Sequence, residues 1–355
     1  MSWRSRAALI FVAASVAACA RNPKPEQNPS PLTLPARVGA APPGSGASAP
    51  ASNANPFALD QFDLQRMFKR LTDLSFMTQL GSEMIVRKVT YSGADKLPIP
   101  AYFFAPKDTS RKRAALIFVH DGIHGDLSDT YVPLIRSLVR DGYVIVAPEY
   151  RGSTGYGKNF YDAIDYGGKE VDDVLLAREF LRDVVPYADL GRLGIIGWSH
   201  GGFITLHSIF RHPEFFRVAI AHVPVADLPA RMRTHDDSYQ SLFSNQAAYG
   251  GTYAQKPQVY IARSPVAHVR ELKTPLLVHA ASNDDDVFII ENRNLRDSMV
   301  AAGKDRAGLY RYREFADPPG GHGFNRIQTK EAKESLDETL AFLRKYLHPE
   351  RSLKK

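Results

Sequence analysis

The sequence is poor in cysteine, and this sets the first limits on its chemistry. Cys19 is the only cysteine among 355 residues, so no disulfide can form within the chain and no thiolate cluster can hold a zinc ion. The hydrophobic content of 44% and the charged content of 23% are ordinary for a folded protein. With no internal repeat period visible, we expect neither a wholly disordered chain nor a repeat array.

A strong excess of charge of one sign is missing from the region that we expect to fold. The formal net charge is +7, but residues 1–56 carry +4 of it, from five basic residues against Glu26, which leaves +3 for the other residues. Charges of the two signs are interspersed in residues 57–355, and no basic run is interleaved with aromatic residues. We therefore expect no nucleic-acid partner.

The chain also lacks an apolar run at its start that is long enough to cross a bilayer, which needs about 20 residues. Two arginines precede a short apolar run over residues 7–14, and Val-Ala-Ala-Cys follows at residues 16–19. This order is typical of a secretory signal peptide and resembles a bacterial lipobox, in which the cysteine is acylated. A plain secretory peptide with a leftover cysteine is the alternative. The lipobox interpretation predicts a signal peptide over residues 1–18 and lipidation of Cys19. The protein would then be anchored to a membrane of the cell envelope, on its periplasmic face.

Composition divides the rest of the chain into segments. Residues 19–56 hold nine prolines and almost no large apolar side chains, which predicts a disordered tether. From Phe57 onward apolar residues recur at three- and four-residue spacing, which predicts an amphipathic helical segment over residues 57–82. We expect this helix to dock on the folded domain; bordering the active site is the alternative. Residues 83–348 then form the main domain, and residues 349–355 a basic tail.

The main domain alternates strands with helices. Residues 85–91 and 99–104 predict an antiparallel entry hairpin, and helical spacing marks residues 170–183 and 330–347. Short continuous apolar runs, typical of strands buried on both faces, occupy residues 114–119, 143–147 and 193–197. Further strands are predicted over residues 218–223, 276–280 and 309–315. The alternation predicts an α/β fold, with a mostly parallel central sheet and helices on both faces.

The clearest chemical motif is G-W-S-H-G-G at residues 197–202. G-x-S-x-G directly after a buried strand and before an apolar helical stretch is typical of a nucleophile elbow, a turn so tight that glycines must flank it. Such a turn lifts the Ser199 hydroxyl above the sheet edge and points the N–H of His200 at a developing oxyanion. A glycine-rich turn with a purely structural role is the alternative interpretation.

An elbow serine needs a base and an orienting acid, in the chain order Ser, Asp or Glu, His. His322 lies in a glycine-flanked loop after the predicted strand 309–315, so its ring can reach Ser199. Other histidines precede the acidic loop, lie within a predicted strand, or fall at the tail. The acid is expected at residues 284–286, three adjacent aspartates that follow the strand 276–280.

Several motifs together resemble the catalytic domain of the prolyl oligopeptidase family of serine peptidases, over about residues 85–347. The motifs are E-Y-R-G-S-T-G-Y-G at residues 149–157, the elbow, Ser-Pro at 264–265, D-x-x-V at 284–287, and the glycines around His322. The resemblance implies the α/β-hydrolase fold. It also makes the first aspartate of D-x-x-V, Asp284, the triad acid, with Asp286 next and Asp285 last as alternatives.

The resemblance also implies a second oxyanion donor, from the loop after the strand 114–119. Members of the family use either a tyrosine hydroxyl or a glycine amide there. This loop, residues 120–124, contains no tyrosine, which leaves the Gly122 N–H as the candidate beside the His200 N–H.

This chain departs from the family pattern in two ways. Familiar members carry an N-terminal β-propeller, for which this chain has no length. The residue two positions after the triad acid is usually an Asn or Arg that donates to a substrate carbonyl, whereas Asp286 can only accept when ionised. We expect peptide recognition to be weakened or rebuilt here, and Asp286 suits a cationic group of the substrate. Trp198 and Tyr156 are further candidates for the substrate pocket, although each fits a core position equally well.

The resemblance implies a serine hydrolase that works through an acyl-enzyme and cleaves short peptides or acyl-peptides. A carboxylesterase acting on small or aryl esters is the alternative, because fold and triad do not fix the leaving group. A remote alternative is a non-catalytic surface binding protein. No cofactor or metal is expected, since the H-x-x-x-H spacing of His120 and His124 lies on a loop and does not place two ligands on one face.

Overall fold

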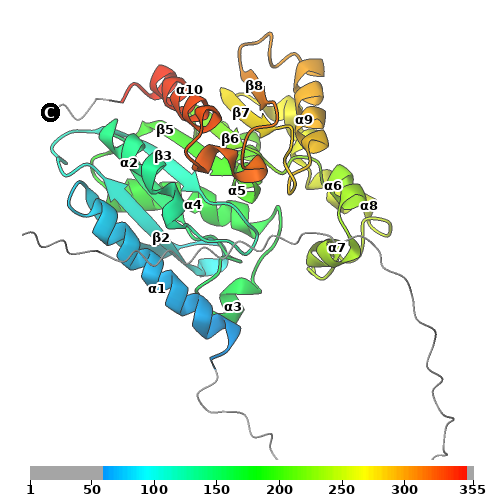
Figure 1. Ribbon diagram of the computed structural model, residues 1–355, viewed down its shortest axis with the longest axis horizontal. Helices are drawn as coiled ribbons and strands as arrows, with labels where there is room; N and C mark the ends of the chain where they lie inside the picture. Colours follow the sequence, from blue (N-terminus) through cyan, green and yellow to red (C-terminus); the bar gives the residue numbers. More distant parts are fainter. Residues whose placement is uncertain (1–58, 350–355) are drawn as a thin grey trace, which may run out of the picture. The chain divides into compact units, whose positions relative to one another are not determined.

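The computed structural model describes residues 59–349 (Figure 1). The predicted signal peptide, Cys19, the predicted tether and the basic tail beyond Pro349 lie outside the described residues. Within residues 59–349, no helix has the length and apolar character needed to cross a membrane.

An eight-stranded sheet forms the centre of the fold, with its strands in the order β1-β2-β4-β3-β5-β6-β7-β8. β1 pairs antiparallel with β2, and β2 with β4, whereas all the other neighbours are parallel. All eight strands expected from the sequence are present, although β5 begins earlier than predicted. Their bounds are β1 Ile85–Ser92, β2 Pro98–Ala105, β3 Arg113–Val119, β4 Val144–Pro148, β5 Ala188–Trp198, β6 Val218–His222, β7 Leu276–Ala281 and β8 Tyr310–Phe315.

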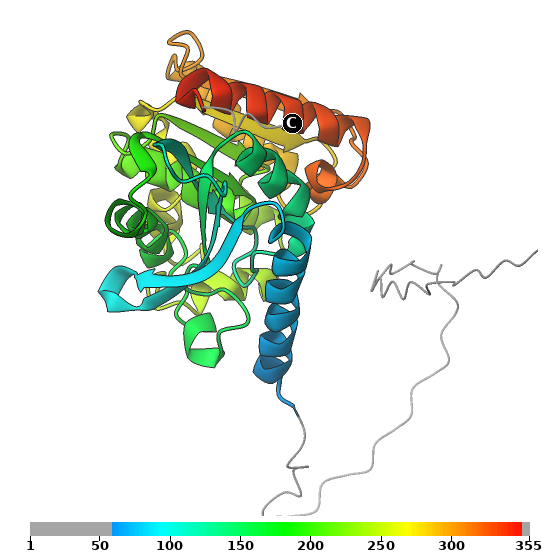
Figure 2. The same ribbon diagram turned by 90° about the vertical axis from the view of Figure 1, so that its left-hand side faces the viewer.

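Helices cover both faces of the sheet (Figures 1 and 2). Side chains of α1 (Gln61–Leu80), α2 (Val132–Arg140) and α10 (Lys330–Leu347) share one hydrophobic cluster with one face of the sheet. Side chains of α4 (Lys169–Val184), α5 (His200–Arg211) and α9 (Ile289–Ala301) share a second cluster with the other face. Parallel strands covered on both faces explain why β3, β4, β6 and β7 are wholly buried.

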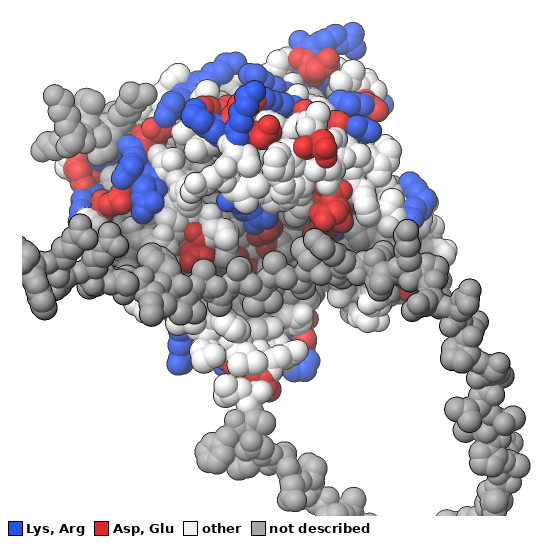
Figure 3. Space-filling view, in the orientation of Figure 1, with Lys and Arg blue, Asp and Glu red and all other residues white. Residues whose placement is uncertain are grey.

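Short helices fill the connections between these elements, mostly at the carboxyl ends of the strands. They are η1 (Ala94–Lys96), η2 (Asp129–Tyr131), α3 (Lys158–Tyr161), α6 (Leu228–Thr234), α7 (Asp237–Ser244), α8 (Pro257–Ala262), η3 (Pro265–Glu271) and η4 (Gly321–Arg326). The part of the chain that the structure describes contains no β-propeller. On the face shown in Figure 3, basic and acidic side chains are interspersed.

The helix predicted near the start of the domain is α1, and it packs beside β1, α2 and η2 (Figure 2). The face through which it docks is not the apolar face that the spacing predicts. Its buried residues are Lys69, Phe76 and Leu80. Five residues of the predicted apolar face are instead 39% to 63% exposed: Leu64, Met67, Phe68, Leu71 and Leu74. We call these five residues the α1 stripe.

A buried ion pair explains this orientation of α1. Lys69 is 3% exposed and forms a very short contact with Glu149, which is fully buried directly after β4. Its Nζ also donates to Asp126 at 2.7 Å and to the carbonyl oxygen of Leu127 at 3.2 Å. A buried charge without a partner is costly by several kcal/mol. The pairing therefore turns the Lys69 face of α1 inward and leaves the α1 stripe in solvent.

Candidate active site

Ser199 occupies the sharp turn between β5, which ends at Trp198, and α5, which begins at His200. Its backbone has φ +52° and ψ −116°, a combination that non-glycine residues adopt at a cost of about 1–3 kcal/mol. The turn is held by the Ser199 N–H, which donates to the carbonyl oxygen of His222 at 2.9 Å, and by the Ser199 carbonyl, which accepts from Phe203 N–H at 3.0 Å. The serine is thus fixed at the carboxyl edge of the sheet.

The two outer glycines of the motif are required by steric contact. A Cβ atom on Gly197 would lie 2.1 Å from the carbonyl oxygen of Gly201. A Cβ atom on Gly201 would lie 2.3 Å from the carbonyl oxygen of His120. Both distances are far below van der Waals contact, so the strand–turn–helix geometry predicted for the elbow is confirmed.

His322 and Asp284 meet at the same edge of the sheet. His322 lies in η4, after β8, and its Nδ1 is 2.9 Å and 2.8 Å from the two carboxylate oxygens of Asp284. Asp284 follows β7, is 5% exposed, and accepts the N–H groups of Asp286 at 3.0 Å and Val287 at 2.8 Å. These two backbone donors fix the carboxylate, and the carboxylate in turn orients the imidazole.

The charges around His322 favour its protonated form. Burial opposes a charged imidazole, but the hydrogen bond and charge of Asp284, together with the charge of Asp286, raise the pKa of His322 above its usual value. Asp286 Oδ2 lies 3.8 Å from His322 Nε2. Of the three adjacent aspartates, Asp284 is the one buried against Nδ1, whereas Asp285 and Asp286 are exposed.

The chain order Ser, Asp, His therefore brings Ser199, Asp284 and His322 to one sheet edge, after β5, β7 and β8. Among the hydrogen bonds of residues 59–349, the Asp284–His322 contact is present and a Ser199 Oγ–His322 contact is not. Hydrogen bonds between a nucleophile and its base are often long before substrate binds.

The two predicted oxyanion donors lie on α5 and on the loop after β3. The His200 N–H belongs to the first turn of α5, where N–H groups lack partners within the helix and the helix dipole favours negative charge. Gly122 has φ +80°, and its carbonyl oxygen accepts the hydroxyl of Tyr150 at 2.6 Å. This bond fixes the loop that carries the Gly122 N–H.

The ring of His200, the residue after the serine, is buried. It is 1% exposed, and its centroid is 4.3 Å from that of Tyr166. Burial holds the pKa of His200 well below its usual value, so the ring is neutral. Burial also raises the pKa of Glu170, whose Oε1 is 3.8 Å from His200 Nε2, to about 8. The His200–Glu170 pair therefore carries little charge at neutral pH.

The sequence did not predict the partner of Asp286. Arg231, from α6, is 2% exposed and donates to Asp286 Oδ1 at 2.7 Å and to Glu291 Oε1 at 2.8 Å. Its Nε also donates to the hydroxyl of Tyr239 at 2.6 Å. The carboxylate of Asp286, which is 49% exposed, thus faces the site with its charge partly compensated. No local signal marks this pairing, because the two residues are 55 positions apart.

Two predicted pocket residues pack in the interior. Trp198 is 2% exposed, stacks on His222 with centroids 4.5 Å apart, and donates from Nε1 to Asn325 Oδ1 at 3.2 Å. Tyr156 is partly buried and packs against Phe160 at 5.3 Å between centroids. Neither side chain contacts Ser199, Asp284 or His322 through a hydrogen bond within residues 59–349.

The histidines of the loop after β3 have separate partners. His120 Nε2 lies 3.0 Å from Ser153 Oγ, and His124 Nδ1 lies 2.8 Å from the carbonyl oxygen of Gly152. Within residues 59–349, no group of three or more His, Cys, Asp or Glu side chains is placed to hold a metal ion.

A parallel sheet with a serine in a strand–helix turn, and an Asp–His pair after two later strands, defines the α/β-hydrolase class. Within that class, the chain belongs to the prolyl oligopeptidase family, which matches residues 132–350. The matching family is one of serine peptidases. Acylamino-acid-releasing enzyme 2 of Oryza sativa subsp. japonica is 28% identical over 234 residues, which cover 64% of this chain and 30% of that protein.

Solved structures confirm the fold. A puromycin-hydrolyzing peptidase of Mycobacterium tuberculosis is 27% identical, with a TM-score of 0.65 over 77% of this chain and 41% of that one. An acylaminoacyl peptidase of Pyrococcus horikoshii has the same TM-score of 0.65 at 20% identity, over 79% of this chain and 44% of that one. The chain thus spans less than half the length of these relatives.

Proposed function

We propose that the protein hydrolyses acyl bonds with Ser199 as nucleophile, His322 as base and Asp284 as orienting acid. The observation that carries the proposal is the Asp284–His322 pair at the sheet edge that also holds the strained Ser199 turn. His322 Nε2 takes the hydroxyl proton as Ser199 Oγ attacks the acyl carbon. The same proton passes to the leaving group. Water, activated by His322, then hydrolyses the acyl-enzyme and regenerates Ser199.

The proposed oxyanion hole consists of the His200 and Gly122 N–H groups. The position of the first at the N-terminus of α5 supports its role, since the helix dipole adds to its hydrogen bond. For the second, support comes from the bond between Tyr150 and the Gly122 carbonyl, which limits movement of the loop. Losing one such donor costs about 10²–10³ in kcat.

The proposed substrates are short peptides or acyl-peptides, by analogy with relatives named for the release of acylated amino acids. A carboxylesterase is the second candidate, and Asp286 is the observation that favours it. A carboxylate cannot donate to a peptide carbonyl, and Arg231 compensates its charge without lying in its place.

Amide and ester turnover separate these candidates. We would assay N-acetyl-alanine p-nitroanilide and p-nitrophenyl butyrate with the wild type, Ser199→Ala, and the exposed control Ser238→Ala. The proposal expects hydrolysis of both by the wild type and the control, and a loss of about 10⁴-fold or more in Ser199→Ala. Ester turnover alone favours the esterase. Absence of both activities in the folded wild type favours a non-catalytic binding protein and contradicts the proposal.

We also propose that Cys19 carries the lipid that anchors the enzyme to a membrane surface of the cell envelope. Support comes from the sequence, where a basic stretch and a short apolar run lead to the lipobox-like residues 16–19. Metabolic labelling with an alkynyl fatty acid is expected to mark the wild type and not Cys19→Ser. Equal labelling of the two would contradict the anchor.

A further inference from the structure

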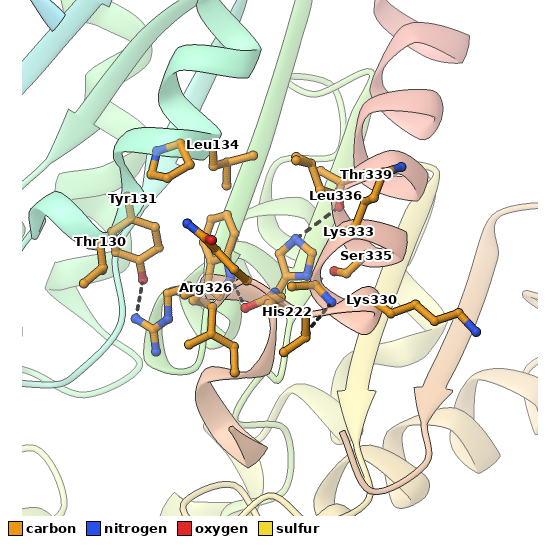
Figure 4. Close-up of a pocket in the computed structure, with 17 residues that line it drawn as sticks. Thr130, Tyr131, Leu134, His222, Arg326, Lys330, Lys333, Ser335, Leu336 and Thr339 are labelled. Carbon is orange, nitrogen blue, oxygen red and sulfur yellow. Dashed lines mark hydrogen bonds between the residues drawn. The ribbon is translucent and has the colours of Figure 1, made fainter. Parts of the chain in front are cut away.

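A cavity of about 490 Å³ lies between α2 and α10, on the sheet face where Trp198 is buried (Figure 4). Its lining comes from η2 and α2, the ends of β5 and β6, the segment 325–330, and the first turns of α10. Ser199, Asp284 and His322 belong to the described residues but not to this lining. Its volume falls within the range of small-molecule sites, so the cavity is large enough for a small molecule and its lining does not include the proposed triad.

The inner wall of the cavity is mostly apolar, and its polar groups include Thr339 and one imidazole. Leu134, Trp198 and Leu336 supply apolar surface. His222, at the end of β6, is 1% exposed; Nε2 lies 3.4 Å from Thr339 Oγ1, and Nδ1 has no partner within the described structure. Figure 4 shows its ring among the lining residues, with the bond to Thr339. A buried nitrogen without a partner costs free energy, which a ligand that bonds it would recover.

The chemistry of His222 selects an amide. Burial holds the pKa of His222 well below its usual value, so the ring is neutral and one nitrogen donates while the other accepts. If Nε2 donates to Thr339, Nδ1 accepts; if Nε2 accepts, Nδ1 donates. An amide offers both an N–H and a carbonyl oxygen, and therefore suits either tautomer, whereas a carboxylate suits only a donating Nδ1.

All charged residues of the lining are basic. Arg326 is paired with Asp121 at 2.6 Å, and Lys333 with Asp337 at 2.6 Å. Lys330 is the least engaged, since its side chain is 82% exposed and its nearest carboxylate oxygen, on Glu334, is 3.7 Å away. Of the three basic side chains, Lys330 is therefore the one most available to an anion.

We propose that this cavity binds an N-acylated amino acid. The acyl chain lies against Leu134, Trp198 and Leu336, the amide bonds His222 Nδ1, and the carboxylate faces Lys330. N-acylated amino acids are also a product class of the proposed acyl-peptide hydrolysis. The inference needs no turnover, however, because it concerns binding at residues outside the triad.

Trp198 provides a direct reporter of this binding. The chain holds two tryptophans, Trp3 and Trp198, so the full chain carrying Trp3→Phe has one. Titration with N-octanoylglycine is expected to give a saturable change in Trp198 fluorescence. Octanoate, which lacks the amide, is expected to bind about five- to tenfold more weakly. The methyl ester of N-octanoylglycine, which lacks the charge, is expected to bind about two- to fivefold more weakly.

Variants localise the signal to the cavity. Ala332→Phe fills the space from α10 and is expected to abolish the saturable change, while Lys330→Gln weakens binding about two- to fivefold. Lys345→Gln, on the same helix but outside this lining, is the matched control and is expected to bind as the parent does. No saturable signal in the parent, undiminished binding by Ala332→Phe, or equal affinity for octanoate would overturn the proposal. Ser199→Ala is expected to bind N-octanoylglycine as the parent does. Failure of the proposed hydrolysis at Ser199 would therefore be distinguishable from failure of binding at the cavity.

Discussion

Asp284 and Glu149 are both buried carboxylates that contact a base, yet they stand in very different surroundings. Asp284 contacts His322, whose side chain is 14% exposed at the sheet edge beside the Ser199 turn. Glu149 is fully buried and contacts Lys69, which is 3% exposed. Its second neighbour is His120 Nε2, at 3.6 Å. A base at an open edge can exchange a proton with a substrate, whereas an enclosed base can only hold two elements together.

The chemical type of a buried pair therefore does not reveal its role. Asp284–His322 is expected to matter for activity and little for folding. Lys69–Glu149 is expected to matter for folding and little for activity.

The substitution Asp284→Asn is expected to have the largest effect, a loss of activity. The asparagine keeps an oxygen for the N–H groups of Asp286 and Val287, but its NH₂ group opposes the Nδ1–H tautomer of His322. We expect kcat/KM to fall by about 10³–10⁴ while thermal unfolding stays close to that of the wild type. Asp285→Asn, at an exposed position, is the matched control. An equal loss in that control would refute the assignment of Asp284.

The second prediction concerns the enclosed pair. Lys69→Met leaves Glu149 buried without its cation, so the free energy of unfolding is expected to fall by about 3–5 kcal/mol. kcat/KM of the folded fraction is expected to remain near the wild-type value. Urea denaturation and initial rates measure the two quantities.

Arg70→Met, at the exposed neighbouring position, is the control for Lys69→Met and should change stability by less than about 0.5 kcal/mol. The double variant Lys69→Met/Glu149→Leu is expected to recover part of the loss, because it removes the unpaired charge. Equal destabilisation by both single variants would show that the ion pair does not hold α1.

The third prediction is the pH dependence. A base must be neutral to accept the Ser199 proton, so kcat/KM is expected to fall as the pH drops through the raised pKa of His322. Asp286→Asn removes a charge 3.8 Å from Nε2, which lowers that pKa and moves the acid limb to lower pH. Glu149→Gln leaves the limb in place. A limb that stays or moves upward in Asp286→Asn would contradict the proposed electrostatics.

The smallest effect is expected in the α1 stripe. Phe68→Ser, at a side chain that is 61% exposed, should change the free energy of unfolding by less than about 0.5 kcal/mol. Phe76→Ala, on the buried face of the same helix, should cost about 3–5 kcal/mol. Comparable losses in denaturation of the two variants would mean that the stripe is covered in solution.

Much of this arrangement follows from local sequence. Continuous apolar runs predicted β3, β4 and the end of β5, because parallel strands buried on both faces need apolar residues throughout. The glycines around Ser199 are dictated by backbone contacts within a few residues. The order of Asp284 and His322 after β7 and β8 follows from the direction of parallel strands, whose carboxyl ends meet at one edge.

What the sequence did not reveal depends on side chains far apart in the chain. The spacing of apolar residues in α1 predicted a helix but the wrong buried face, since Lys69 is oriented by Glu149, 80 positions away. The Arg231–Asp286 contact joins residues separated by 55 positions. The cavity beside Trp198 depends on how α2 and α10 meet, which no local pattern encodes.

Covalent labelling would show whether Ser199 is a nucleophile activated by His322. We would treat the full chain with a fluorophosphonate probe, beside Ser199→Ala and His322→Ala, and locate the adduct by mass spectrometry. We expect an adduct on Ser199 in the wild type that is absent from Ser199→Ala and lost or greatly slowed in His322→Ala. An unlabelled but folded wild type, or an adduct on another residue, would contradict this expectation.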